Sequence, residues 1–450
     1  MLLSPISHPL HATVRVPGSK SLTNRALIIA ALANGVTTIH NALESDDSAQ
    51  CVESLQRLGF VVGAKHASPR SEAERDASPL RVVGLSGHIP SSHAELFVGN
   101  AGTAARFLTA MLTLGHGEYI VDGDARMRER PIGDLVDALT QLGANIQPNY
   151  QSHSASLQGL SLPITGHQLC LPLKVIASGL KGGVTRVTGD ISSQFLSGLL
   201  IAAPYAQSPI EIILKNDLNS KPYVDMTIAV MKDFGVEVER EGYSRFLIAP
   251  QCYKAQPEFM IESDASAASY FFAAPAIVSG TVRVENVSRD SKQGDIAFLD
   301  VLQKMGCEVT EGNDFITVGA QHAAPLQGVD VDMRDIPDTA QTLAAIAPFA
   351  NSPTTIRGIA SARVKETDRV AAMCNELRRV GVTVEEYDDG LKIYPCDKIQ
   401  SATIQTYNDH RMAMAFALIG LRAEGITIDN PSCVSKTFPN YFEVLESLRI

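Results

Sequence analysis

Leu139-Thr-Gln-Leu-Gly143 belongs to a pattern of a long apolar residue, two variable residues, an apolar residue and glycine that occurs five times in the chain. The other four copies are Leu55-Gln-Arg-Leu-Gly59, Met231-Lys-Asp-Phe-Gly235, Leu302-Gln-Lys-Met-Gly306 and Leu377-Arg-Arg-Val-Gly381. We predict that each copy ends a helix. Subtraction of the glycine positions gives spacings of 84, 92, 71 and 75 residues, so the 450 residues divide into six units of about 75. The sixth unit ends at Val444 to Leu448 without a glycine.

The first helix of each unit is predicted to be buried on all sides. These helices are rich in alanine and other apolar residues all round, as in residues 25–33 and 267–274. A helix without a polar face is a buried helix. Each one starts near a residue type that caps a helix N-terminus: Ser19, Asn100, Ser192, Ser263, Asp338 and Asn408.

The second helix of each unit is predicted to lie on the surface. Residues 132–142 place apolar side chains at i, i+3, i+4, i+7 and i+10, which makes a one-sided stripe. Three of these helices have proline near the first turn, where its missing N–H costs nothing: Pro131, Pro222 and Pro439. Alternating strands follow the glycine, often as a hairpin, and we expect residues 64–79 to be a long hairpin tip.

Two domains of three units each are expected, because one hydrophobic core rarely grows beyond about 250–300 residues. The sixth unit lacks a hairpin, and we predict that the strand-like run 11–16 fills this gap. The chain would then start and end in the same domain. The predicted domains are residues 21–252 and residues 253–450 plus 1–20. Three buried helices per domain would start on one side, and their N-termini favour an anion-binding cleft between the domains.

The composition excludes several classes of protein. The net charge of −11 argues against a broad surface for nucleic acids or anionic membranes. No basic segment followed by an apolar core marks a signal peptide at the N-terminus, and no apolar run approaches the 18 residues of a spanning helix. The seven cysteines are scattered without a Cys-x-x-Cys pair. We expect a cytoplasmic, thiol-reduced protein without bound metal.

Cationic residues gather in the loops and at the predicted helix starts of several units. Each cluster alone suits a surface salt bridge or a helix cap, but the repeat predicts that the clusters converge. One alternative, a solenoid scaffold that uses its repeats only for stability, would not need these cationic clusters. A pure anion-binding module would avoid the acids Asp338, Glu366 and Asp409, whereas proton transfer requires such groups. We therefore favour an enzyme over both alternatives. The clusters include Lys20, Arg25, Arg106, residues 126–130, residues 363–369, residues 408–411 and Lys436.

Four stretches resemble the 5-enolpyruvylshikimate-3-phosphate synthase family, and the likeness covers essentially the whole chain: residues 17–25, 96–103, 128–131 and 363–369. The resemblance implies an α/β fold, a two-domain inside-out α/β barrel of six repeated units with buried parallel helices. It implies transfer of the enolpyruvyl group of phosphoenolpyruvate to the 5-hydroxyl of shikimate 3-phosphate, a step in aromatic amino acid biosynthesis. No cofactor or metal is implied. The expected partners are these two anions only, and the expected state is a monomer.

The resemblance also implies roles for individual residues. Lys20, Asp338 and Glu366 are the expected proton-transfer groups, and His410 is expected to orient phosphate. The residues expected to hold shikimate 3-phosphate are Ser21, Arg25, Ser192, Ser193, Gln194, Ser220, Tyr223, Asp338, Ser361 and Lys365. Those expected to hold phosphoenolpyruvate are Lys20, Asn100, Gly102, Arg130, Gln194, Arg369, Arg411 and Lys436.

Two positions depart from the family pattern. Ser361 stands where many relatives have asparagine, and Phe107 stands where proline or a smaller aliphatic residue is often found. Gly102, where alanine would intrude, indicates a glyphosate-sensitive enzyme. The alternative is the sister enzyme that uses UDP-N-acetylglucosamine. That family carries a cysteine in a mobile loop, and no cysteine lies between Gly117 and Pro131 here.

Overall fold

The computed structural model describes residues 1–64, 79–149, 169–189, 192–320 and 326–449. The chain forms two compact units: the N-terminal unit, residues 20–261, and the C-terminal unit, residues 1–19 and 262–450. The sequence places these boundaries after Lys20 and Cys252. The second boundary comes later because β13 (Glu258–Met260) pairs with β2 (Asn34–His40) inside the N-terminal unit. Most of the expected hairpin tip, 64–79, lies outside the described residues.

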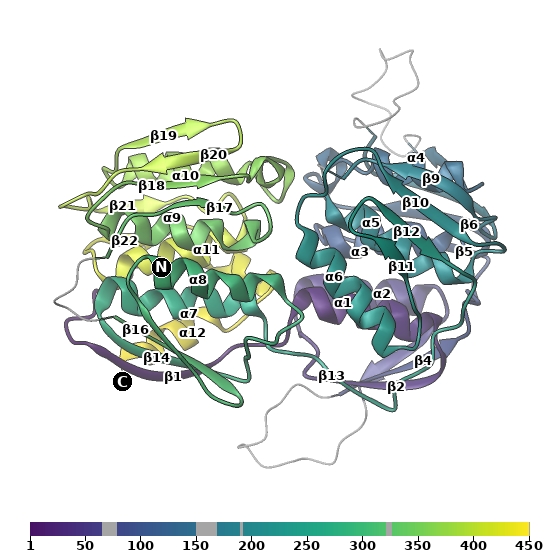
Figure 1. Cartoon of the computed structure of the whole chain (residues 1–450), viewed down its shortest axis with the longest axis horizontal. Coiled ribbons are helices and arrows are strands. Elements are labelled where there is room, and N and C mark those ends of the chain that lie inside the picture. The colour runs from purple at the N-terminus through teal and green to yellow at the C-terminus, as the bar shows by residue number, and fades with distance from the viewer. Residues whose placement is uncertain (65–78, 150–168, 190–191, 321–325, 450) are drawn as a thin grey trace. The chain divides into compact units, whose positions relative to one another are not determined.

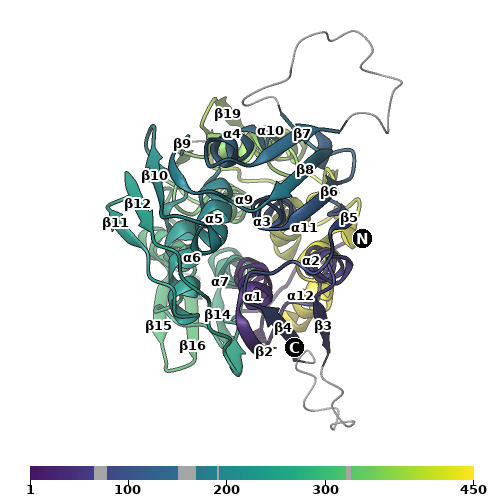
Figure 2. The ribbon, with the colours of Figure 1, turned by 90° about the vertical axis from the view of Figure 1, so that its right-hand side faces the viewer.

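Three inner helices form the centre of the N-terminal unit (Figures 1 and 2), and their residues are almost entirely buried. Three outer helices are buried along one face only; in α4, for example, Asp137 and Thr140 are exposed while Leu135 and Leu139 are buried. This difference confirms the predicted division into buried and surface helices. The inner helices are α1 (Lys20–Leu32), α3 (Gly102–Leu112) and α5 (Ser193–Ala202), and the outer ones are α2 (Asp46–Arg57), α4 (Gly133–Gln141) and α6 (Lys221–Asp233).

Sheets cover these helices from outside. Each sheet has four strands, in the orders β13-β2-β4-β3, β5-β6-β8-β7 and β9-β10-β12-β11. The first pair of each sheet is parallel and the other two pairs are antiparallel. The remaining strands are β3 (Val61–Ala64), β4 (Leu80–Leu85), β5 (His93–Phe97), β6 (His116–Asp122), β7 (Asn145–Pro148), β8 (Leu173–Ser178), β9 (Gly183–Val187), β10 (Ile210–Leu214), β11 (Glu239–Glu241) and β12 (Arg245–Ile248).

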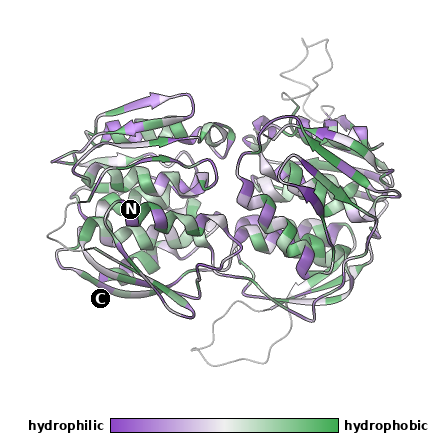
Figure 3. Ribbon diagram, in the orientation of Figure 1, coloured by the Kyte–Doolittle hydropathy of each residue, from purple (hydrophilic) through white to green (hydrophobic). Residues whose placement is uncertain are grey.

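The C-terminal unit repeats this plan. Its central helices are predominantly hydrophobic (Figure 3), and every residue of α9 and α11 is buried. Its sheets have the orders β1-β14-β16-β15, β17-β18-β20-β19 and β21-β22. The inner helices are α7 (Ala265–Val278), α9 (Ala340–Ile346) and α11 (His410–Ala417), and the outer ones are α8 (Phe298–Lys304), α10 (Arg369–Arg379) and α12 (Tyr441–Glu446). The strands are β1 (Leu10–Arg15), β14 (Gly280–Glu285), β15 (Glu308–Glu311), β16 (Phe315–Ala320), β17 (Asp330–Asp332), β18 (Thr354–Arg357), β19 (Val384–Tyr387), β20 (Gly390–Ile393), β21 (Ala402–Ile404) and β22 (Ile426–Ile428).

The N-terminal strand does not fill the gap in the sixth unit, so this prediction is wrong. Strand β1 pairs in parallel with β14 and completes the sheet of the fourth unit. A complete unit needs a strand before its inner helix, as β5 precedes α3. The first and fourth units exchange these strands. Strand β1 precedes α1 but pairs in the sheet of the fourth unit, and β13 precedes α7 but pairs in the sheet of the first unit. In the sixth unit, residues 1–3 lie beside β22 instead: Leu2 bridges to Thr427, Leu3 N donates to Ile426 O at 2.9 Å, and Ile428 N donates to Met1 O at 2.8 Å.

The repeated glycines end the outer helices, as predicted. Gly59, Gly143, Gly235, Gly306 and Gly381 have φ between +79° and +102°. In each copy the residue after the glycine donates its N–H to the first carbonyl of the pattern, for example Phe60 N to Leu55 O at 3.0 Å. The glycine itself donates three residues back, as Gly59 N does to Gln56 O at 2.9 Å. These two bonds define a Schellman cap, which explains why glycine recurs at this position.

The expected caps of the inner helices are only partly correct. Ser192 accepts from Gln194 N and caps α5, but the caps of α7 and α11 are Asp264 and Asp409, each one residue later than expected. No described side chain caps α3 or α9. In α9 the short 3₁₀ turn Pro337–Thr339 precedes the helix and takes the place of a cap.

No helix in the described ranges is long and apolar enough to cross a membrane. All seven cysteines are free thiols.

Candidate active site

Arg369 is the centre of a charged cluster in the C-terminal unit. It is the first residue of α10, and its side chain is 2% exposed. Its Nε donates to Asp409 Oδ2 at 2.8 Å, its Nη1 to Asp338 Oδ1 at 3.1 Å, and its Nη2 to Glu366 Oε2 at 2.8 Å. Hydrogen bonds between charged groups are the stronger ones, so these three carboxylates fix the guanidinium in one orientation.

Arg411 and Lys436 extend this cluster. Arg411 Nη2 lies 2.7 Å from Asp338 Oδ2, and Lys436 Nζ lies 3.1 Å from Glu366 Oε1. All these side chains are less than one-fifth exposed. Asp338 and Glu366 therefore each bridge two cations. The structure brings together five residues that the sequence predicts to act together: Asp338, Glu366, Arg369, Arg411 and Lys436.

The charges of the cluster keep Arg369 protonated. Burial alone would lower the pKa of Arg369, but Asp409, Glu366 and Asp338 together raise it above its ordinary value. Tyr270, which receives a hydrogen bond from Arg411 Nη1 at 3.5 Å, has its pKa raised to about 12 by burial despite that arginine. The cluster thus combines three cations with three carboxylates, and its arginine forks have the geometry for two-point binding of an anion.

A second group of predicted residues meets in the N-terminal unit around Arg130. Its Nη1 donates to Asn100 Oδ1 at 2.9 Å and to the Asn100 carbonyl at 3.2 Å, and Arg130 is 4% exposed. Gly102 lies against the same guanidinium: a Cβ at this position would be 2.4 Å from Arg130 Nη2. The absence of a side chain at Gly102 is therefore required for the observed position of Arg130.

Arg25 is buried between α1, α5 and α6. Its Nε donates to Thr227 Oγ1 at 2.7 Å, and its two Nη atoms donate to the carbonyls of Ser21 and Tyr223, each at 2.9 Å. The ring of Phe107 lies 5.3 Å from the guanidinium carbon. Burial lowers the pKa of Arg25 to about 9, and the nearby Tyr223 acts in the opposite direction. The departure Phe107 is thus in contact with a predicted substrate residue.

Four further predicted residues lie at the ends of helices in the N-terminal unit. Lys20 opens α1, and its Nζ is 3.5 Å from Asp47 Oδ2. Ser192 caps α5, where Gln194 Nε2 donates to Thr103 Oγ1 at 3.2 Å. Ser220 precedes α6 with a φ of +59° and is buried. All four thus lie at the N-terminal ends of helices, the region where the repeat predicts site residues.

Three further predicted residues lie in the C-terminal unit near the charged cluster in sequence. Ser361 lies buried in the 3₁₀ turn Ala360–Val364, and Lys365 follows it directly. His410 is fully buried, with Nδ1 3.6 Å from Asp409 Oδ1. Other cations of the predicted loops have structural partners: Arg128 pairs with Asp122, and Arg363 with Asp368 and Glu386.

Several partners of the site residues are absent from the sequence prediction. Asp47 pairs with Lys20, and Thr227 holds Arg25 together with Ser197. Asp47 follows the helix cap Ser45, so its acidic side chain reads in the sequence as an ordinary first-turn residue. Thr227 and Ser197 carry no charge, and only the packing of α6 against α1 and α5 reveals their role.

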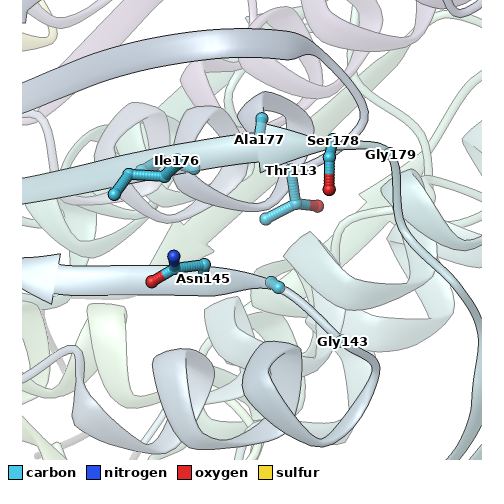
Figure 4. A pocket seen from close by; sticks show the side chains of 9 residues that line it. Thr113, Gly143, Asn145, Ile176, Ala177, Ser178 and Gly179 are labelled. Carbon is cyan, nitrogen blue, oxygen red and sulfur yellow. The ribbon is translucent and has the colours of Figure 1, made fainter.

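A small depression lies elsewhere in the N-terminal unit, beside β7 and β8 (Figure 4). Its lining includes Thr113, Gly143, Asn145 and residues 175–179. No charged side chain lines it, and none of the predicted site residues does. It therefore lacks the groups needed for the expected chemistry.

The sequence model of the family described as EPSP synthase (3-phosphoshikimate 1-carboxyvinyltransferase) matches residues 5–445. Two relatives named 3-phosphoshikimate 1-carboxyvinyltransferase are each 48% identical. The one from Sulfurovum sp. (strain NBC37-1) matches over 99% of this chain and 98% of its own, and the one from Shewanella oneidensis over 97% and 96%.

A solved structure of EPSP synthase from Acinetobacter baumannii aligns with a TM-score of 0.76 at 25% identity, covering 99% of this chain and 97% of that one. This likeness agrees with the two-domain inside-out α/β fold expected from the sequence. The chain belongs to the EPSP synthase (3-phosphoshikimate 1-carboxyvinyltransferase) family.

Proposed function

We propose that this protein transfers the enolpyruvyl group of phosphoenolpyruvate to the 5-hydroxyl of shikimate 3-phosphate, giving 5-enolpyruvylshikimate 3-phosphate and phosphate. The observation that carries this proposal is the family match over nearly the whole chain, together with relatives at 48% identity that bear the name of this transferase. The relatives give no support to the use of UDP-N-acetylglucosamine.

Phosphoenolpyruvate has a carboxylate and a phosphate, and we propose that it is held by cations from both units. In the C-terminal unit, Arg369, Arg411 and Lys436 are within one hydrogen-bonded cluster. In the N-terminal unit the proposed residues are Lys20, Asn100, Gly102, Arg130 and Gln194. Arginine forks suit two-point binding of such groups, and lysine supplies a movable point charge.

Shikimate 3-phosphate is proposed to bind mainly to the N-terminal unit. Arg25 is the proposed cation, since a bound anion would offset part of the cost of its burial. The other proposed contacts are Ser21, Ser192, Ser193, Gln194, Ser220 and Tyr223, with Asp338, Ser361 and Lys365 from the C-terminal unit.

The reaction consists of an addition step with two proton movements and an elimination step with one. In the addition step, the 5-hydroxyl oxygen bonds to C2 of phosphoenolpyruvate and loses its proton, while the methylene carbon gains one. In the elimination step, the methyl group formed loses a proton and the C–O bond to phosphate breaks. Lys20, Asp338 and Glu366 are the proposed groups for these transfers. Asp338 and Glu366 each contact two cations, which favours their ionised forms before they accept a proton.

The test is a coupled assay of phosphate release with purified protein, phosphoenolpyruvate and each acceptor in turn. We expect release with shikimate 3-phosphate and none with UDP-N-acetylglucosamine. Activity with the nucleotide sugar alone would overturn the proposal.

We further propose that the enzyme acts as a monomer in which the two units close on the bound substrates. The support is that the predicted phosphoenolpyruvate residues are divided between the two units. Small-angle scattering should show one chain mass throughout and a smaller radius of gyration with both substrates than without. An unchanged radius would contradict closure.

A further inference from the structure

Glu376 is a buried acid of α10 for which the proposed reaction has no use. It lies seven residues, or two helical turns, after Arg369 and is fully buried. Its Oε2 accepts from Arg379 Nε at 2.8 Å and from Gln405 N at 2.9 Å, and its Oε1 accepts from the Tyr407 hydroxyl at 2.7 Å. A carboxylate is costly to bury without such donors. These bonds therefore tie the segment 405–407 firmly to α10.

The segment that Glu376 holds contains an unusual turn. Tyr407 and Asn408 have φ of +53° and +54°, and Asp409 N donates to Thr406 O at 2.8 Å across them. Two successive residues of positive φ closed by this bond make a turn of type I′. Asparagine tolerates this conformation, but a bulky residue such as tyrosine rarely adopts it. The surroundings must hold Tyr407 in place, and its hydroxyl is bonded to Glu376.

The turn leads directly into the candidate active site. Asp409, the residue after it, accepts from Arg369 Nε and Nη2 at 2.8 and 3.2 Å and caps α11 by accepting from Arg411 N at 2.9 Å. Helix α10 is therefore bonded to the segment 405–409 at two places. Arg369 bonds to Asp409 at the end of this segment, and Glu376 bonds to Gln405 and Tyr407 at its start.

We propose that Glu376 and Tyr407 are positioning residues for Arg369 and Arg411, and this inference rests on the proposed function of those two arginines. Neither residue is placed in contact with a substrate. Their hydrogen bond holds the strained turn, the turn sets the position of Asp409, and Asp409 directs the guanidinium of Arg369 and the start of the helix that carries Arg411.

The test compares Tyr407→Phe and Glu376→Gln with the wild-type enzyme in steady-state kinetics. Tyr407→Phe removes one hydroxyl and keeps the ring. We expect the KM for phosphoenolpyruvate to rise about fivefold or more, and by a larger factor than the KM for shikimate 3-phosphate. Tyr387→Phe is the matched control, because the Tyr387 hydroxyl also donates to a carboxylate, Glu385, at 2.7 Å on exposed β19. This control should leave both KM values unchanged.

Two further variants keep the inference falsifiable. Tyr407→Gly accepts the positive φ but lacks the hydroxyl, so it should also raise the KM for phosphoenolpyruvate, even if Glu376→Gln fails to fold. Arg369→Lys tests the proposed site: no change in that KM would refute the assignment of Arg369 itself. If Arg369→Lys raises the KM while both Tyr407 variants match the wild type, the positioning role is overturned and the proposed function stands.

Discussion

The first turn of α3 lies so close to the guanidinium of Arg130 that there is no space for a side chain at Gly102. The atoms that a new Cβ would meet belong to the flexible end of a side chain, so alanine should displace Arg130 rather than disrupt α3. The bond from Arg130 to Asn100 would then be lost. At the scale of residues, the position of Arg130 in the candidate site thus requires glycine at position 102.

We predict that Gly102→Ala raises the KM for phosphoenolpyruvate and the inhibition constant of glyphosate, each by about tenfold or more. The reason is that a misplaced hydrogen bond to a charged group costs about 1.5–3 kcal/mol. Inhibition assays with wild type and variant give both constants. Gly63→Ala is the control, because its Cβ would meet no atom of the described residues within 4 Å. Equal inhibition constants for wild type and Gly102→Ala would contradict the prediction.

Arg25 provides a test by pH. Its pKa is lowered from its ordinary value to about 9, chiefly by burial, so the native protein holds this proton less tightly than the unfolded chain does. The free energy of unfolding therefore increases as pH rises through about 9, because Arg25 loses its proton more readily in the native protein. A bound anion opposes this loss, because it favours the protonated form of Arg25. We predict that the Kd for shikimate 3-phosphate is smallest below pH 9 and rises by up to about tenfold per unit above it. Isothermal titration calorimetry between pH 7 and 10 measures this dependence.

Arg25→Gln is the matched variant for this measurement. It should bind shikimate 3-phosphate weakly, and its Kd should change little across pH 9. A wild-type profile that is equally flat would show that Arg25 does not supply the titrating charge.

At the scale of elements, the five helix-ending glycines share one backbone geometry but differ in their surroundings. A Cβ on Gly59, Gly143 or Gly381 would approach a neighbouring side chain within 3 Å, whereas at Gly306 it would meet nothing within 4 Å. Gly306 thus isolates the effect of its φ of +102° from any effect of packing.

We predict that Gly306→Ala lowers the free energy of unfolding by about 1–2 kcal/mol, the usual cost of forcing a residue with a Cβ into left-handed backbone. Urea unfolding measures this change, and activity at 25 °C should stay the same because Gly306 is remote in sequence from every proposed site residue. Gly63→Ala, in open space and without a positive φ, should be nearly neutral. Equal stability of the two variants would show that the Schellman cap does not require glycine here.

At the scale of the whole molecule, the exchange of β1 and β13 defines which residues each unit needs to complete its sheets. The N-terminal unit takes its last strand from residues 258–260, which pair with Thr38, Ile39 and His40. Residues 1–19 belong to the C-terminal unit. A division of the chain after Cys252 would remove β13 and leave β2 as the edge of its sheet.

We predict that a fragment of residues 20–261 folds by itself with a cooperative unfolding transition, and that residues 20–252 fold less stably or not at all. Circular dichroism against urea compares the two fragments. Cooperative unfolding of both with the same midpoint would show that β13 is dispensable for the N-terminal unit.

Much of the fold follows from local patterns. The glycine pattern predicts where the outer helices end, because the Schellman cap involves only neighbouring residues. Alanine-rich segments predict the buried helices, since burial follows from the absence of a polar face. The helix caps are less predictable: Asp264 and Asp409 act where Ser263 and Asn408 are equally suitable residue types, because adjacent residues of similar type compete for one backbone position.

The sequence alone determined the repeat, the two classes of helix, the family and the residue types of the site, since these depend on neighbouring residues or on motifs. Only the tertiary structure decided which sheet receives β1, which carboxylate faces which arginine, and that Glu376 holds the turn before Asp409. The physical reason is that strand pairing and ion pairing join residues far apart in the chain. Many partners of suitable chemistry compete for each place, and packing selects one of them.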